Sequence, residues 1–215
     1  MFNCLLDEFP DSYQGYPINT SFRVGIMLTL LLEDESVDDD IKPLIAFNLL
    51  YKDKVPSDKQ IASEGLIWFL TCGKSELYFE NEYVDESSPD KCIDFNVDHL
   101  DIWGAFWSKG IDLDGYELYK DDSGVVHKKR YDMHWFKFMS ALGNLGDCYL
   151  TQKMQYRSTD LSKMKGDTKK YYRDLKEKYK IRKVITKEEH DKYLEELKNT
   201  NGSYYMKLRE LNGGR

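Results

Sequence analysis

The sequence predicts a mainly α-helical protein: a compact multi-helix domain with one or two small β-hairpins and a C-terminal helical appendage. Three observations support this prediction. Apolar residues recur at helical spacing in several separate segments, and capping residues precede most of these segments. Strand-like patterns are confined to two short stretches. The 215 residues, 41% hydrophobic and 32% charged, are enough for one sizeable core.

The N-terminal third predicts a hairpin and three helices. The segment 12–18 predicts the hairpin, because Gly15 supplies the positive φ of a tight turn. Asn19 is the expected N-cap of a buried helix over residues 20–32. A second helix starts near Asp39 or Asp40, after an acidic loop, since Pro43 is tolerated only in a first turn. Its predicted buried stripe is Ile41, Leu44, Ile45 and Leu49.

The third helix begins after the sequence Ser57–Gln60, which matches an S-x-x-Q capping box. It runs to about Cys72, and Gly73 suits the left-handed residue that follows a helix. Its predicted buried side consists of Ile61, Gly65, Trp68, Phe69 and Cys72. The next stretch, residues 76–101, holds nine acidic residues and one lysine, and its first half predicts a loop or linker.

The fourth helix is expected to start at Asp94 or Asn96 and to stop at Gly110. Its apolar residues cluster on one side: Leu100, Trp103, Phe106 and Trp107. Alternating residues from Tyr116 to His127 around the turn 121–124 predict a second hairpin.

Three further helices are predicted after this hairpin. The first is aromatic, with Trp135, Phe138, Met139 and Leu142 on one face. Asp147 is the expected cap of a short helix that holds Leu150 and Met154. Asp167 or Thr168 caps a long helix with Tyr171, Tyr172, Leu175 and Tyr179. We place the domain boundary after residue 183. A helical extension over 184–215 carries a narrow apolar seam, which either folds back or finds its partner in another chain.

No motif for catalysis, metal binding or cofactor binding is recognisable. The four histidines form no H-E-x-x-H pattern, and the four cysteines are widely spaced, as expected of reduced thiols. The segment Asp98–Asp101 fits a polar helix face better than a metal or acid–base site. We therefore expect a protein that is not an enzyme and needs no cofactor. No membrane-spanning run or secretory signal is evident.

One charged segment allows two interpretations. Residues 163–198 carry thirteen basic and eight acidic residues, with tyrosines interleaved. Such a helix could follow a phosphate backbone, or it could be a solvated face that complements the acidic stretch 76–101. The net charge of −7 does not favour a nucleic-acid partner, so the second interpretation is preferred.

Four motifs together resemble the bacteriophage gene-product-fifteen family of tailed phages and prophages of Gram-positive bacteria. The motifs are YPINTSFR at 16–23, GLIWFLTCGK at 65–74, AFWSKGIDL at 105–113, and MHWFKFMSAL at 133–142 leading to YRSTDLSK at 156–163. The similarity spans about residues 12–183. Residues 116–129 look like an insertion relative to the family pattern, and the helix after Ile185 lies outside it.

The resemblance implies a non-enzymatic tail-assembly factor, a chaperone that binds the long tape-measure protein and helps to recruit tail-tube subunits in the host cytoplasm. Alternatives are a structural component of the virion tail and a helical adaptor for nucleic acid or protein. A homo-oligomer is compatible with each function. Exposed aromatic side chains would suit a chaperone. The candidate partner-binding residues are Trp103, Phe106, Trp107, Tyr171 and Tyr172, although the first three also fit a core.

Overall fold

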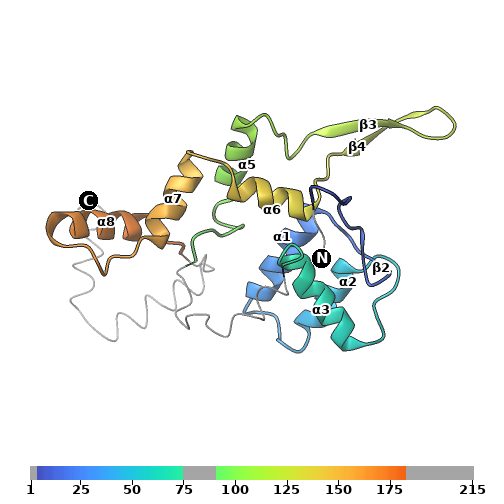
Figure 1. The fold of residues 1–215 in the computed structure, drawn as a ribbon, viewed down its shortest axis with the longest axis horizontal. Helices are drawn as coiled ribbons and strands as arrows, with labels where there is room; N and C mark the ends of the chain where they lie inside the picture. Colours follow the sequence, from blue (N-terminus) through green and yellow to red (C-terminus); the bar gives the residue numbers. More distant parts are fainter. Residues whose placement is uncertain (1–3, 75–90, 183–215) are drawn as a thin grey trace, which may run out of the picture. The chain divides into compact units, whose positions relative to one another are not determined.

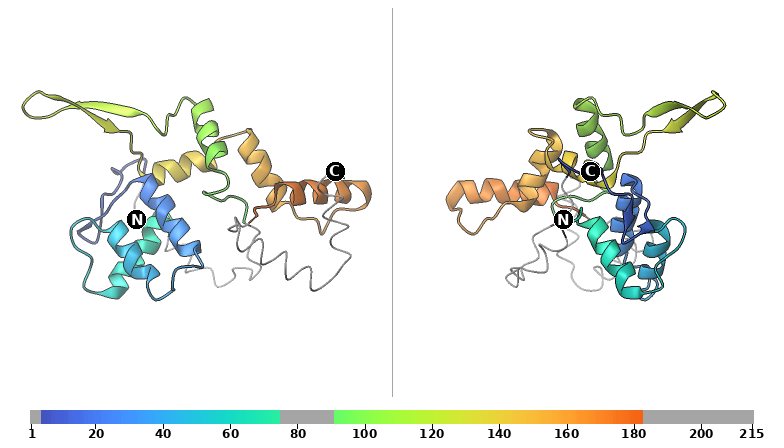
Figure 2. Two further views of the ribbon diagram at one scale, coloured as in Figure 1. Left: turned by 180° about the vertical axis from the view of Figure 1, so that it is seen from behind. Right: turned by 45° about the vertical axis from the view of Figure 1, so that its right-hand side comes forward.

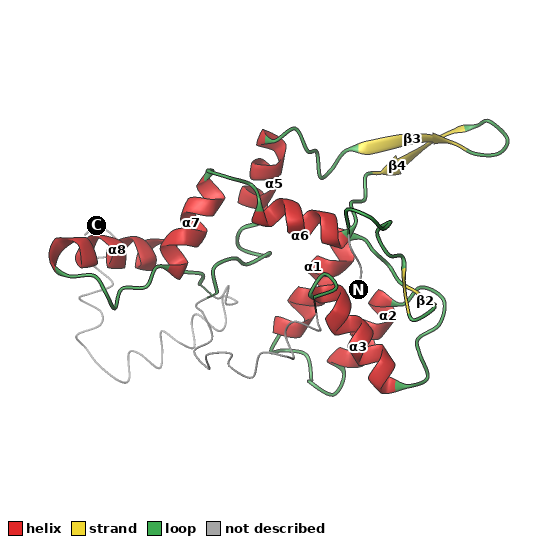
Figure 3. Cartoon of the chain, in the orientation of Figure 1, coloured by secondary structure: helices red, strands yellow, loops and turns green. Residues whose placement is uncertain are grey.

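The computed structural model describes residues 4–74 and 91–182. Met1–Tyr179 form one compact unit, and a second unit begins at Lys180. The predicted extension over 184–215 and most of the predicted acidic loop lie outside the described residues. Within the described part the protein is mainly helical with two small antiparallel hairpins, so the predicted fold class is confirmed (Figure 3).

The N-terminal part consists of the first hairpin and three helices (Figure 1). Strands β1 (Ser12–Tyr13) and β2 (Tyr16–Pro17) pair around Gln14 and Gly15, which both have positive φ, as a two-residue turn requires. Helices α1 (Phe22–Glu33), α2 (Lys42–Leu50) and α3 (Lys59–Leu70) follow. All three helices contact one another, and their buried residues belong to the one hydrophobic core of the described part of the chain.

Helix α6 (Trp135–Gly143) joins this part through its N-terminus. The amide of Phe22 donates to the carbonyl of Met133 (2.8 Å), and the amide of Trp135 donates to the carbonyl of Thr20 (2.7 Å). Because these bonds run in both directions, α1 and α6 start side by side although more than 100 residues separate them. Their close approach is possible because Gly25 leaves room for the ring of Trp135.

The remaining elements follow in chain order. Helix α5 spans His99–Ser108, strands β3 (Tyr116–Lys120) and β4 (Val126–Arg130) form the second hairpin, and α7 (Tyr149–Ser158) and α8 (Gly166–Tyr179) complete the described elements. Helix α7 contacts both α5 and α8. Figure 2 shows the hairpin from two further sides, extending away from α5 and α6.

Aromatic rings link α1, α5 and α6 at the centre of the core. The ring of Phe138 stacks on Phe22 (5.0 Å between centroids) and on Phe106 (5.1 Å). The ring of Trp135 also packs against the ring of Phe138, with 5.7 Å between the two centroids. Stacked aromatic pairs add about 0.5–1.5 kcal/mol each beyond the burial of their surface. The predicted aromatic helix is therefore confirmed. Its aromatic side chains lie at the centre of the core.

Several predicted helix starts are wrong by one to four residues. Ser21, not Asn19, caps α1, and Asp58, not Ser57, caps α3. Asp98 precedes α5, and Cys148 replaces Asp147 before α7. Helix α2 begins at Lys42 after the uncapped Ile41, and α8 begins at Gly166, so Asp167 lies inside its first turn. Before α1, α3 and α5 more than one polar residue could serve as the cap, so spacing alone does not choose among them, whereas a tertiary contact can. Ser21, for example, also donates its hydroxyl to Asp132 at 2.6 Å.

The predicted buried stripe of α2 is also wrong. Ile41, Leu44 and Ile45 are exposed and Leu49 is half-buried, whereas Ala46, Phe47 and Leu50 are buried. The helix is apolar on most sides, so its spacing does not identify a single face. Contacts with α1 and α3 make that choice. The predicted side of α3 needs a smaller correction: Gly65 and Phe69 are buried as expected, together with Ala62 and Leu66, and the helix ends at Leu70, before Cys72.

Candidate partner-binding surface

The five predicted partner-binding residues fall into three environments. Phe106 is fully buried in the core, so it is not accessible to a partner. Trp103 and Trp107 are exposed on α5, where their rings stack at 5.2 Å with an interplanar angle of 14°. Tyr171 is exposed on α8, and Tyr172 is half-buried 6.5 Å from Tyr156 of α7. Figure 1 shows α7 between α5 and α8, so the tryptophans and the tyrosines form separate surfaces.

A buried charge cluster holds α5 in place against α7. The carboxylate of Asp98, directly before α5, is fully buried. It accepts two hydrogen bonds from Arg157 (2.6 and 3.0 Å) and one from Lys153 (2.8 Å), both on α7. Lys153 also donates to Asp101, one turn into α5, at 2.6 Å. Because the two acids and two bases neutralise each other, the cluster can lie within the protein and lock the two helices together.

The cluster also changes the acidity of its members. Burial alone would raise the pKa of Asp98, but the hydrogen bonds from Arg157 and Lys153 outweigh it and hold this pKa below its ordinary value. Burial would lower the pKa of Lys153, but its bonds to Asp101 and Asp98 raise it. Asp98 and Lys153 therefore both stay charged at neutral pH. Arg157 further donates to the carbonyls of Cys92 and Tyr179, which ties the chain before α5 and the end of α8 to the same point.

Sequence analysis missed this cluster. Asp98 and Asp101 were interpreted as a polar helix face, which is wrong for Asp98 because it is fully buried. Lys153 and Arg157 lie four residues apart on α7, and Asp98 and Asp101 lie three apart, so each pair shares a helix face. This complementary spacing is the signal that could have indicated an ion-pair network between two helices.

The opposite side of α5 carries an exposed apolar stripe. Leu100, Trp103 and Trp107 are 72%, 41% and 55% exposed and recur at the spacing of one helix face. Large apolar side chains at this spacing normally pack against another element. The surface formed by these three residues is called the α5 stripe below. Since the buried cluster fixes the helix, the α5 stripe is held in one orientation.

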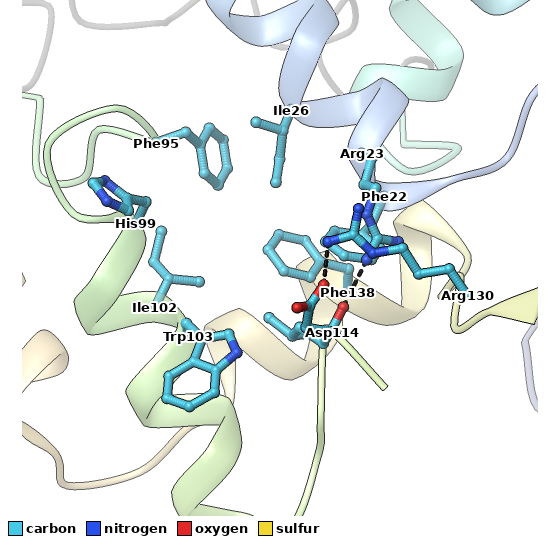
Figure 4. Close-up of a pocket in the computed structure, with 11 residues that line it drawn as sticks. Phe22, Arg23, Ile26, Phe95, His99, Ile102, Trp103, Asp114, Arg130 and Phe138 are labelled. Carbon is cyan, nitrogen blue, oxygen red and sulfur yellow. Dashed lines mark hydrogen bonds and ion pairs between the residues drawn. The ribbon is translucent and has the colours of Figure 1, made fainter. Parts of the chain in front are cut away.

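A pocket of about 280 Å³ lies beside the α5 stripe (Figure 4). Trp103 and His99 stand on its α5 side, and Ile26 of α1 stands opposite. The further apolar lining consists of Phe22, Phe95, Ile102, Leu113 and Phe138. An ion pair between Asp114 and Arg130 marks the rim. An apolar wall with a few polar groups at the rim is typical of a site that accepts apolar side chains.

Metal binding and thiol reactivity can be assessed for the described residues. Residues 4–74 and 91–182 contain no group of three or more His, Cys, Asp or Glu placed to hold a metal ion. Burial raises the pKa of the Cys72 thiol to about 11, which keeps it protonated and unreactive at neutral pH. In the same part of the chain, no helix has the length and apolar character needed to cross a membrane.

The fold and this surface define a mainly helical protein with an exposed aromatic stripe beside an apolar pocket. The family model described as Bacteriophage Gp15 protein matches residues 5–181, so the chain belongs to that family. This match confirms the resemblance noted from the sequence motifs. No curated protein and no solved structure is significantly similar to the chain. Family membership makes this a phage protein.

Proposed function

We propose that this protein is a non-enzymatic tail-assembly factor that binds an apolar helix of the tape-measure protein during phage tail morphogenesis. The α5 stripe carries the proposal, together with the pocket beside it. An amphipathic helix binds by placing side chains at i, i+3, i+4 and i+7 into an apolar groove. Trp103 and Trp107 supply large contact area at little cost in rotamer entropy, which suits a binder of many similar helical segments.

The proposed complex can be tested by co-expression with the tape-measure protein. We expect the wild-type chain to keep this partner soluble and to co-purify with it. Replacing Trp107 with Ala should abolish co-purification, because the side chain is exposed and stacks on Trp103 at the centre of the proposed contact. Tyr149→Ala is the matched control and should leave co-purification unchanged, since it removes a similarly exposed aromatic ring from α7.

Stability measurements separate a binding defect from misfolding. Trp107→Ala should leave the free energy of unfolding within about 1 kcal/mol of wild type, whereas Phe106→Ala should lower it by about 3–5 kcal/mol because that ring is fully buried. Unchanged partner solubility with wild-type protein would reject the chaperone function. Stoichiometric amounts of the chain in purified virions would instead support a structural role in the tail.

A further inference from the structure

The β3–β4 hairpin is exposed along its whole length. All ten strand residues are exposed, including the large apolar side chains of Tyr116, Leu118, Tyr119 and Val126. Its sheet contains only these two strands among the described residues. A lone two-stranded hairpin is marginally stable in water, and Figure 1 shows this one extending away from the helices. Such an arm has an apolar surface and strand edges that a partner could cover.

The hydrogen-bond pattern identifies the outer edge of β3. The amide of Tyr131 donates to Gly115 (2.7 Å), and the amide of Asp121 donates to Val125 (3.1 Å). Bonded pairs alternate with non-bonded pairs in an antiparallel ladder. Glu117 and Tyr119 therefore direct their backbone groups toward β4, as Gly115 and Asp121 do. The intervening residues direct theirs outward: Tyr116, Leu118 and Lys120.

The outer edge of β4 is protected against pairing with itself. By the same alternation its outward residues are Val126, Lys128 and Arg130, and Lys129 lies between the two cations. Cationic side chains on an edge strand prevent pairing between edges. If the β4 strands of two copies paired antiparallel with Lys128 at the centre, the two Lys128 side chains would oppose each other and repel. The β3 edge has one acid and one base in its five residues, and most of its side chains favour strands.

We propose that two copies of this chain pair through their β3 edges, antiparallel, with Leu118 on the two-fold axis. This register is the one that pairs all three outward residues: Leu118 opposes Leu118, and Tyr116 opposes Lys120 on both sides. The two hairpins then form a four-stranded sheet. No like charges oppose each other, and each Lys120 faces an aromatic ring. That ring attracts cations already, because the Nζ atom of Lys128 lies 3.8 Å from the centroid of Tyr116 in the same chain.

A second copy fits this edge because the pairing is self-complementary and closes after two subunits, as isologous interfaces do. Pairing of two five-residue strands buries less than the roughly 1,000 Å² of a stable interface. The dimer is therefore weak and depends on concentration. The proposal concerns the hairpin alone and does not rest on the proposed tail-assembly function.

Cysteine cross-linking tests the register. In a hydrogen-bonded pair the Cα atoms lie about 5.5 Å apart, which is within the roughly 4.4–6.8 Å range of a disulfide. Leu118→Cys should therefore give a covalent dimer on mild oxidation, in a background where the exposed Cys4 is replaced by Ser. Val126→Cys is the matched control on the other strand and should give none. Absence of the Leu118→Cys dimer, or equal dimer from both variants, would overturn the proposal.

Analytical ultracentrifugation of the full chain tests the dimer without a cross-link. Wild type should shift from monomer to dimer as concentration rises. Leu118→Lys should remain a monomer because it places two cations opposite each other. Val126→Lys, a change of the same charge at a similarly exposed position, should dimerise as wild type does. Circular dichroism should show that all three fold alike. A wild-type chain that stays monomeric, or forms a ladder of larger oligomers, would contradict β3 pairing.

Discussion

Gly25 lies in the first turn of α1, where that helix approaches the start of α6, and a Cβ atom there would collide with ring atoms of Trp135. Trp135 is almost fully buried, so its ring cannot move aside without disturbing the core. We predict that Gly25→Ala lowers the free energy of unfolding by about 1–3 kcal/mol, the usual cost of overpacking. Urea denaturation measures this change.

The matched control for Gly25 is Gly104, which lies inside α5 at a position where an added Cβ atom would meet only open space. Gly104→Ala should raise stability by about 0.5–1 kcal/mol, because alanine favours a helix interior over glycine. If both substitutions had the same effect, the close approach of α1 and α6 at Gly25 would be refuted.

Asp98 is the residue on which the charge cluster depends. Replacing it with Asn leaves Arg157 and Lys153 partly uncompensated in the interior, so we predict a loss of about 3–5 kcal/mol at neutral pH. Asp101→Asn should cost less, because among the described residues Asp101 pairs only with Lys153, and it is partly exposed. Thermal and urea unfolding of the two variants would compare them.

The effect of Asp98→Asn on stability should also depend on pH. The pKa of folded Asp98 is lowered, since hydrogen bonds from Arg157 and Lys153 outweigh the effect of burial. The carboxylate therefore contributes fully to the free energy of unfolding above about pH 3.9, which is the usual pKa of an aspartate in an unfolded chain. This contribution is lost as the pH falls through the lower pKa of Asp98 in the folded protein. The stability gap between wild type and Asp98→Asn should narrow below about pH 4. A constant gap down to the acid transition would show that the carboxylate does not act through its charge.

Helix α5 shows how one element serves three purposes. Its N-terminal acids bind α7, Phe106 and Ile102 enter the core, and the α5 stripe remains at the surface. The sequence predicted the helix and placed Leu100, Trp103, Phe106 and Trp107 in one cluster. The structure separates them, because Phe106 faces α6 while the other three face away. The division was not visible from the sequence, since both faces of the helix carry large apolar residues.

The turn of the β3–β4 hairpin is organised by Asp121. Its carboxylate accepts bonds from Ser123 and from the amide of Val125, and it pairs with His127. Bonds from Ser123 and His127 lower the pKa of Asp121 to about 2. We predict that Asp121→Ala speeds amide hydrogen exchange at Ser123 and Val125, because both amides lose their acceptor. NMR at neutral pH measures this exchange.

The neighbouring Asp122 provides the control for this turn. Asp122→Ala should leave exchange in the hairpin unchanged, since it is Asp121 that accepts the bonds of the turn. The wild-type turn should also stay ordered as the pH falls, until Asp121 is protonated near pH 2. Equal exchange rates in the two variants would contradict an organising role for Asp121.

For the molecule as a whole, the hairpin and the helical core should be separable. Every residue from 116 to 130 is exposed, and the bond between Tyr131 and Gly115 brings the two ends of the hairpin together. We predict that replacing residues 116–130 with a Gly-Gly turn leaves the thermal midpoint of the core unchanged. It should also abolish dimerisation. Differential scanning calorimetry and ultracentrifugation measure the two effects, and a markedly lower midpoint would show that the core depends on the hairpin.

The sequence by itself determined the elements and the family. Helix spacing, the Gln14–Gly15 turn, the turn at 121–124 and the four shared motifs all act over short stretches of chain, and each was visible without a structure. The structure decided which helix faces are buried, where each helix begins, and where the pocket lies. It also brought Asp98 to Lys153, 55 residues away in the chain. These features depend on contacts between distant segments, and the energy of such contacts exists only once the chain has folded.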